Sequence, residues 1–158
     1  MDVHIDTRDG VQLPCDYRVE ELVVFALRHM QCPDNCEVSV SFVDEEEIQA
    51  LNDEYRGVCS VTDVLSFPCD DPYEADPAEE LIELGDIVIC PSVIDEQRHE
   101  FGTSFAQEAS LMTVHSVLHL LGYDHIEPLD RVHMREKEEL IMEQLGLPAS
   151  ISYIAEDQ

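Results

Sequence analysis

Apolar and polar positions follow two different periods along the chain, and each period predicts a different element. Residues 18–30 carry apolar side chains at helical spacing, and residues 36–43 alternate between apolar and polar, which is typical of a half-buried strand. A Pro-Asp-Asn turn at 33–35 separates the two. Asp44 follows the strand and can cap an acidic helix that runs toward Tyr55. The pattern therefore predicts helix, strand and helix in succession.

Three further strands are predicted from short apolar segments. Residues 62–67 and 85–90 are rich in β-branched and aliphatic side chains, and each is followed by a proline. Residues 3–6 form a shorter alternating segment that the Asp9-Gly10 turn signal closes. The segment 69–77 is rich in Asp and Pro and is predicted to be an exposed loop.

The second half of the chain is predicted to be mainly helical. Helices are expected after Pro91, from Ser104 and from Leu129. Ser104 and Gln107 have the spacing of a capping box at the start of the second of these. Strands mixed with helices in this order predict an α+β (mixed α/β) fold, in which a small mixed four-stranded sheet packs against about five helices.

Length and composition favour one compact domain over residues 1–158. The chain is 44% hydrophobic with a mean hydropathy of −0.16, and a chain of 158 residues can bury about two-thirds of its unfolded surface in one core. No apolar run reaches the ~18 residues that a membrane helix needs, and the first residues lack the basic and apolar regions of a signal peptide. We therefore expect a cytoplasmic protein with no membrane association.

The formal net charge of −28 changes this picture, because it argues against a protein that coats nucleic acid non-specifically. Seven of the eight cationic residues are arginines, and Lys137 is the one lysine. The charge has two interpretations: a solubilising surface of an acidic proteome, or a surface that docks on a basic partner protein. A polyanionic substrate would require either screening ions or a local cationic site.

The six cysteines are predicted to be reduced thiols, because nothing marks the chain as secreted. Cys32 and Cys36 have a C-x3-C spacing that could supply half of a zinc site, but no second matching pair occurs. We expect this pair to be buried on either side of a turn.

The candidate chemistry lies in residues 113–125, which hold three of the seven histidines. His115 and His119 are four residues apart, so they lie on one face of the predicted helix, where two imidazoles can bind one metal ion. Gly122 can end the helix in the left-handed conformation, which would bring His125 back toward the same ion. The sequence thus predicts a three-histidine metal site at the end of a central helix.

Three neutral imidazoles leave a fourth position for water, which is the arrangement of a catalytic zinc site. One Zn²⁺ per chain would lower the pKa of that water from 15.7 toward ~7, so His115 is predicted to act in catalysis through a metal-activated water. Hydrolysis is the predicted reaction class.

The spacing H-x-x-x-H-x-x-G-x-x-H also occurs in metzincin peptidases, in which a glutamate follows the first histidine and serves as the base. Ser116 stands at that position here, so a zinc metallopeptidase is the weakest of the alternatives. Asp124 adjoins a predicted ligand and could either orient an imidazole or cap the turn.

The histidine motif and two further segments, 51–57 (LNDEYRG) and 62–68 (TDVLSFP), resemble the YbeY family of endoribonucleases and rRNA maturation factors. Residues 84–87 (LGDI) and the acidic helix from Met134 to Gly146 match similar segments of that family, so the resemblance covers about residues 36–146. The chain departs from it at Ser116, where many relatives carry glycine.

The resemblance implies a zinc-dependent endoribonuclease that cuts single-stranded RNA and acts in 16S rRNA 3′-end maturation and 70S ribosome quality control. It implies zinc on His115, His119 and His125, and it implies that Arg56 lies near the metal. A guanidinium there could hold a phosphate with two hydrogen bonds, whereas its structural alternative is a surface arginine that ends a helix. The segment 62–68 would line the cleft.

The partners implied are rRNA and the ribosome or ribosomal proteins, and no organic cofactor is expected. The acidic composition favours a second hypothesis, a non-catalytic ribosome assembly factor whose fold is stabilised by zinc and whose surface docks on basic ribosomal proteins.

Overall fold

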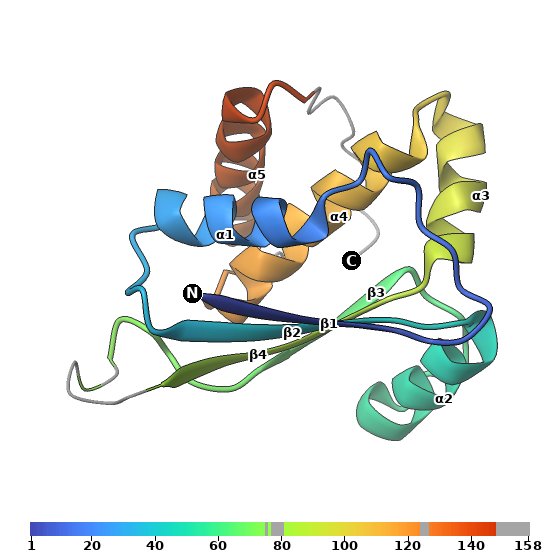
Figure 1. Cartoon of the computed structure of the whole chain (residues 1–158), viewed down its shortest axis with the longest axis horizontal. Coiled ribbons are helices and arrows are strands. Elements are labelled where there is room, and N and C mark those ends of the chain that lie inside the picture. The colour runs from blue at the N-terminus through green and yellow to red at the C-terminus, as the bar shows by residue number, and fades with distance from the viewer. Residues whose placement is uncertain (75, 77–80, 124–126, 148–158) are drawn as a thin grey trace.

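A computed structural model of the chain describes residues 1–74, 76, 81–123 and 127–147. It contains four strands and five helices in these ranges (Figure 1). In chain order they are β1 (Asp2–Thr7), α1 (Val19–His29), β2 (Cys36–Phe42), α2 (Glu45–Arg56), β3 (Val64–Pro68), β4 (Ile82–Ile89), α3 (Pro91–Phe101), α4 (Phe105–Leu120) and α5 (Pro128–Gln144).

The four strands form one mixed sheet in the order β1-β2-β4-β3. β1, β2 and β4 run parallel, and β3 pairs antiparallel with β4 at the edge. Figure 1 shows α1, α4 and α5 on one side of the sheet and α2 beside its far end on the other. The predicted α+β fold with a mixed four-stranded sheet and five helices is confirmed.

The alternation of β2 decides which face of the sheet is covered. Val38, Val40 and Phe42 are fully buried beneath the helices, whereas the residues between them are half-buried on the opposite face. Because side chains alternate across a strand, the predicted period-2 pattern gives one apolar face and one polar face. The main core lies between this apolar face and the helices α1, α4 and α5.

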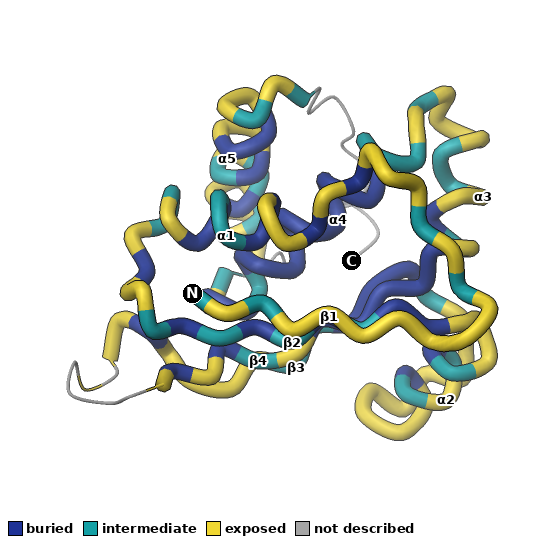
Figure 2. The backbone as a smooth tube through the Cα atoms, viewed as in Figure 1, coloured by how far each residue is buried: buried dark blue, intermediate teal, exposed yellow. Residues whose placement is uncertain are grey.

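α4 is the central helix and is buried on nearly its whole circumference. Figure 2 shows it as a buried tube surrounded by other elements, and Leu111, Val114 and Leu118 are among its fully buried residues. Its apolar residues are in contact with the core on several sides, and the polar side chains buried among them include Thr113 and His115. Its start is fixed as predicted, because the Ser104 side chain accepts a hydrogen bond from the Gln107 amide at 3.1 Å.

The prediction for β4 was three residues too short at its start. The strand begins at Ile82, and Gly85 lies inside it next to a register shift in the pairing with β2. Gly85 has φ +138°, and a Cβ atom there would lie 2.1 Å from the Phe67 carbonyl oxygen. The glycine therefore permits a bulge and a close approach of β3.

The other predicted elements are confirmed to within a few residues. The Asp44 side chain caps α2 by accepting from the Glu47 amide at 2.9 Å, and Gly57 ends that helix with φ +70°. Within the described ranges, no helix combines the length and apolar character that crossing a membrane requires.

Candidate functional site

Two of the predicted metal ligands meet on the buried helix α4. The Nε2 atoms of His115 and His119 lie 3.1 Å apart, and the two rings are nearly perpendicular, at 84° with centroids 4.6 Å apart. His115 is 1% exposed, whereas His119 is half-buried. The four-residue spacing therefore brings together two ring nitrogens, one of them in the protein interior.

The distance between these nitrogens fits a shared metal ion. Tetrahedral zinc binds histidine nitrogen at about 2.0–2.1 Å, which places two such ligands about 3.3 Å apart. The observed 3.1 Å between the Nε2 atoms is close to this separation. Neutral imidazole is also a donor that zinc prefers, so the two residues present fit the group that the sequence predicts.

The remaining predicted members of the centre, His125 and Asp124, lie outside the described residues. Gly122 precedes them with φ +99°, so the chain does turn by a left-handed glycine directly after α4, as predicted. Within the described part of the chain, no group of three His, Cys, Asp or Glu side chains gathers at metal-binding distance. The histidine pair is therefore the described portion of the site.

Glu138 is a member of the site that the sequence analysis missed. Its Oε1 atom accepts a hydrogen bond from Nδ1 of His115, and the Glu138 residue is only 5% exposed. Glu138 lies on α5, between the buried Met134 and Ile141 on the face that packs against α4. A carboxylate on the apolar stripe of an amphipathic helix was the available signal, because such a group is rarely buried without a partner.

The segment 62–68 was predicted to line the cleft; it contains β3, which packs against α4. The end of α4 also approaches the bulge in β4, because the Leu120 side chain lies 3.1 Å from the position of a Cβ on Gly85. The helix that carries the histidines is therefore fixed against the β3–β4 edge of the sheet.

Arg56 is the last residue of α2 and is exposed. None of the hydrogen bonds or ion pairs found among the described residues involves it, so the structure does not join it to the histidine pair. Its neighbour Tyr55 packs edge-on against Phe67 of β3, with ring centroids 5.1 Å apart. This contact ties the end of α2 to the strand that packs against α4.

Ser116, at the position of the peptidase glutamate, is fully buried, and its Oγ atom lacks a hydrogen-bond partner among the described residues. A hydroxyl in this position has neither the basicity nor the access that a general base needs. The geometry thus offers nothing in favour of peptidase chemistry at this residue.

Two cavities lie at opposite ends of α4. A cavity of about 230 Å³ adjoins the histidine end and is lined by Leu121, Gly122, Tyr123, Asp130 and His133. His133 is exposed on α5, as expected for a residue that is not a ligand.

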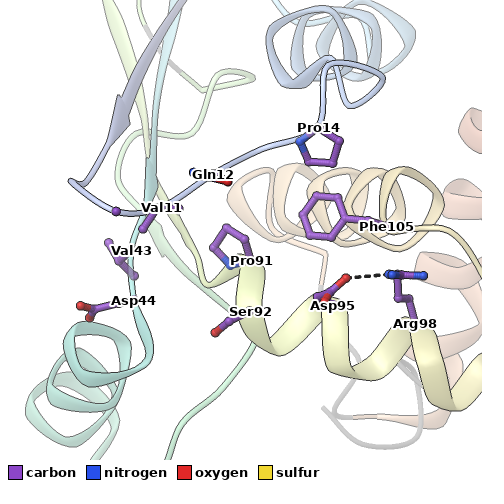
Figure 3. Close-up of a pocket in the computed structure, with 11 residues that line it drawn as sticks. Val11, Gln12, Pro14, Val43, Asp44, Pro91, Ser92, Asp95, Arg98 and Phe105 are labelled. Atoms are coloured by element: carbon purple, nitrogen blue, oxygen red, sulfur yellow. Dashed lines mark hydrogen bonds and ion pairs between the residues drawn. The ribbon is translucent and has the colours of Figure 1, made fainter.

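The larger cavity, of about 430 Å³, lies at the carboxyl ends of β2 and β4 (Figure 3). Its wall includes Asp44, Phe105 and an ion pair between Asp95 and Arg98 at 2.6 Å. Phe105 precedes His115 by ten residues, or about 15 Å of helix. This cavity is therefore separate from the histidine pair.

The cysteines form no metal-binding group of three with other His, Cys, Asp or Glu side chains among the described residues. All six are free thiols, as predicted, and both Cys32 and Cys36 are buried. Burial raises the pKa of Cys36 to about 11, so the group is a neutral thiol near pH 7.

Comparisons with known proteins identify relatives of the chain. Residues 5–146 match the family model described as Endoribonuclease YbeY, which extends the resemblance to β1 and α1. An endoribonuclease YbeY from Caldanaerobacter subterraneus subsp. tengcongensis is 50% identical over 140 residues, covering 82% of this chain and 89% of that protein. One from Thermoanaerobacter sp. is 44% identical over 159 residues, covering 93% and 99%.

A solved structure shares the fold. The solution structure of TM1509 from Thermotoga maritima aligns with a TM-score of 0.56 and 25% sequence identity, covering 95% of this chain and 96% of that one. Together with the family match and the curated relatives, this likeness shows that the chain belongs to the endoribonuclease YbeY family.

Proposed function

We propose that this protein is a zinc-dependent endoribonuclease that cuts single-stranded RNA, acting in the cytoplasm in 16S rRNA 3′-end maturation and 70S ribosome quality control. Family membership supports RNA cleavage, and the observation that carries the metal dependence is the pair of facing Nε2 atoms on His115 and His119. The proposed partners are rRNA and the ribosome or its proteins.

In this proposal His115, His119 and His125 hold one zinc ion, and Asp124 orients one of the imidazoles. When bound, zinc supplies Lewis acidity, which lowers the pKa of water and stabilises charge on a phosphoryl oxygen. The protein holds the two described imidazoles on one rigid helix, so the ligands need no rearrangement when the ion binds. The buried side of the pair excludes bulk water from His115.

Arg56 is proposed to bind the scissile phosphate. Its guanidinium can donate two parallel hydrogen bonds to phosphate oxygens, and its charge would act locally against a chain of net charge −28. The exposed position at the end of α2 leaves the group accessible to an RNA strand. Because the overall field repels RNA, cleavage should also depend on screening by salt or Mg²⁺.

The proposal is tested by measuring zinc content and single-stranded RNA cleavage of the purified chain across a salt and Mg²⁺ series. The wild type should hold one zinc ion and cut RNA, and His119→Ala should lose both. His99→Ala, which changes an exposed histidine on α3, is the matched control and should retain both. Cleavage that survives in His119→Ala would exclude the metal mechanism.

The acidic surface supports a second candidate function, a non-catalytic assembly factor that docks on basic ribosomal proteins and uses zinc for stability. The net charge of −28 is the observation that favours it. Ribosome association that persists when cleavage is absent under every screening condition would select this function over the first.

A further inference from the structure

We infer that Glu138 is a positioning residue that holds His115 in the form required for metal binding. The inference rests on the proposed metal centre and adds to it a residue from a different helix. It concerns which ring nitrogen of His115 carries the proton, and how the ring is kept in place.

The hydrogen bond between the two residues fixes the tautomer of a neutral His115. A carboxylate oxygen can only accept, so Nδ1 of the ring carries the hydrogen and donates it to Oε1 of Glu138. The other nitrogen, Nε2, then presents a lone pair. This is the atom that lies 3.1 Å from Nε2 of His119, where the ion would be shared.

Burial keeps this arrangement in place. His115 is 1% exposed and Glu138 is 5% exposed, so neither side chain can exchange its partner for bulk water without moving α4 and α5 apart. Met134, Ile141 and Met142 are buried on the same helix and pack it into the core. Because the carboxylate is carried by a packed helix, its position relative to the ring is set by the fold.

The charge of Glu138 fits the same role. A zinc ion held by neutral imidazoles would bring two positive charges next to the buried His115. The Glu138 carboxylate beside His115 would offset part of this charge. Partners that accept a hydrogen bond from a metal-binding histidine raise the basicity of that ligand, and their loss lowers metal affinity by about 10–100-fold.

A merely structural role would predict a different outcome. If Glu138 served only to join α4 and α5, its removal would lower stability but leave the zinc affinity of the folded protein and the His115 tautomer unchanged. The two roles are therefore separated by measuring zinc affinity and ring protonation together with the unfolding temperature.

The experiment uses the full chain as wild type, Glu138→Ala, Glu138→Gln and Glu136→Gln. Zinc affinity is measured by competition with a chromogenic chelator, and the protonated ring nitrogen of His115 is identified by nitrogen NMR of the metal-free protein. Glu138→Ala should bind zinc about 10–100-fold more weakly and lose the uniform Nδ1–H form. Glu136→Gln, an exposed change on the same helix, should match the wild type.

Glu138→Gln keeps the test decisive where the alanine variant fails to fold. Its amide can either accept from Nδ1 or donate to it, so the uniform Nδ1–H form should be partly lost, and the missing charge should weaken zinc binding by a smaller factor than alanine does. Wild-type zinc affinity and tautomer in folded Glu138 variants would overturn the inference. Absence of zinc binding in the wild type would instead overturn the proposed function, whereas the tautomer measurement would still report on Glu138.

Discussion

The helices α4 and α2 lie on opposite sides of the sheet and contribute to the protein in different ways (Figure 1). α4 is buried on almost every side, whereas α2 buries only Ile48 and Asn52 and presents an acidic outer face. Two buried polar groups of α4 have partners inside the core: Thr113 bonds Tyr17 at 2.6 Å, and His115 bonds Glu138. Figure 2 shows the same contrast: α4 is mostly dark blue, for buried residues, whereas α2 is mostly yellow and teal, for exposed and half-buried ones.

The two parts of the proposed site, the histidine pair and Arg56, therefore differ in how rigidly the fold holds them. The histidine pair is fixed by a rigid interior helix, which suits a metal ligand that must hold its geometry. Arg56 ends a peripheral helix that packs on the sheet through Ile48 and Leu51, and its exposed neighbour Tyr55 contacts Phe67. A group that meets a long, mobile substrate can be exposed, whereas a metal ligand benefits from enclosure.

The largest expected effect is a loss of stability, and it should be greater for a change on α4 than for the same change on α2. Leu118→Ala on α4 should lower the free energy of unfolding by about 2–5 kcal/mol, because it leaves a cavity in the main core. Leu51→Ala on α2 makes the same chemical change at a half-buried position and should cost about 1 kcal/mol. Urea unfolding measures both, and equal costs would contradict the contrast between the helices.

Arg56→Ala should have the next largest effect, and only on activity. We expect RNA cleavage to fall by about 10–100-fold, because a charged hydrogen-bond donor to the phosphate is lost. Zinc content and the unfolding temperature should stay at wild-type values, since the side chain is exposed and lies outside the histidine pair.

Arg56→Lys sharpens this prediction, because lysine keeps the charge but not the planar pair of donors. It should recover part of the lost cleavage rate in the same RNA assay. Full activity in Arg56→Ala would remove this residue from the proposed site.

The smallest effect is expected at Ser116, inside the rigid helix. Its Oγ atom is buried without a partner among the described residues, so Ser116→Ala removes an unpaired polar group and adds a better helix former. The free energy of unfolding should rise by about 1 kcal/mol in urea unfolding, with zinc content unchanged. A destabilised variant would mean that the hydroxyl is bonded in solution.

Much of the fold follows from local patterns. The alternation over 36–43, the Ser104 cap and the Asp44 cap gave elements that the structure reproduces within a few residues. The predicted strand 85–90 began at Gly85 and missed residues 82–84, and the glycine inside β4 is needed because of the Phe67 carbonyl of a neighbouring strand. That neighbour is known only once the sheet is assembled.

The candidate site likewise has one feature that follows from local spacing and one that follows from helix packing. The spacing alone places His115 and His119 on one face, because four residues are close to one turn of any α-helix. The contact of His115 with Glu138, 23 residues further along the chain, depends on the assembled fold, since it requires α5 to pack against α4. Local spacing determines which side chains of one helix can bind the same ion. The packing of α4 against α5 determines which side chain of another helix hydrogen-bonds to them.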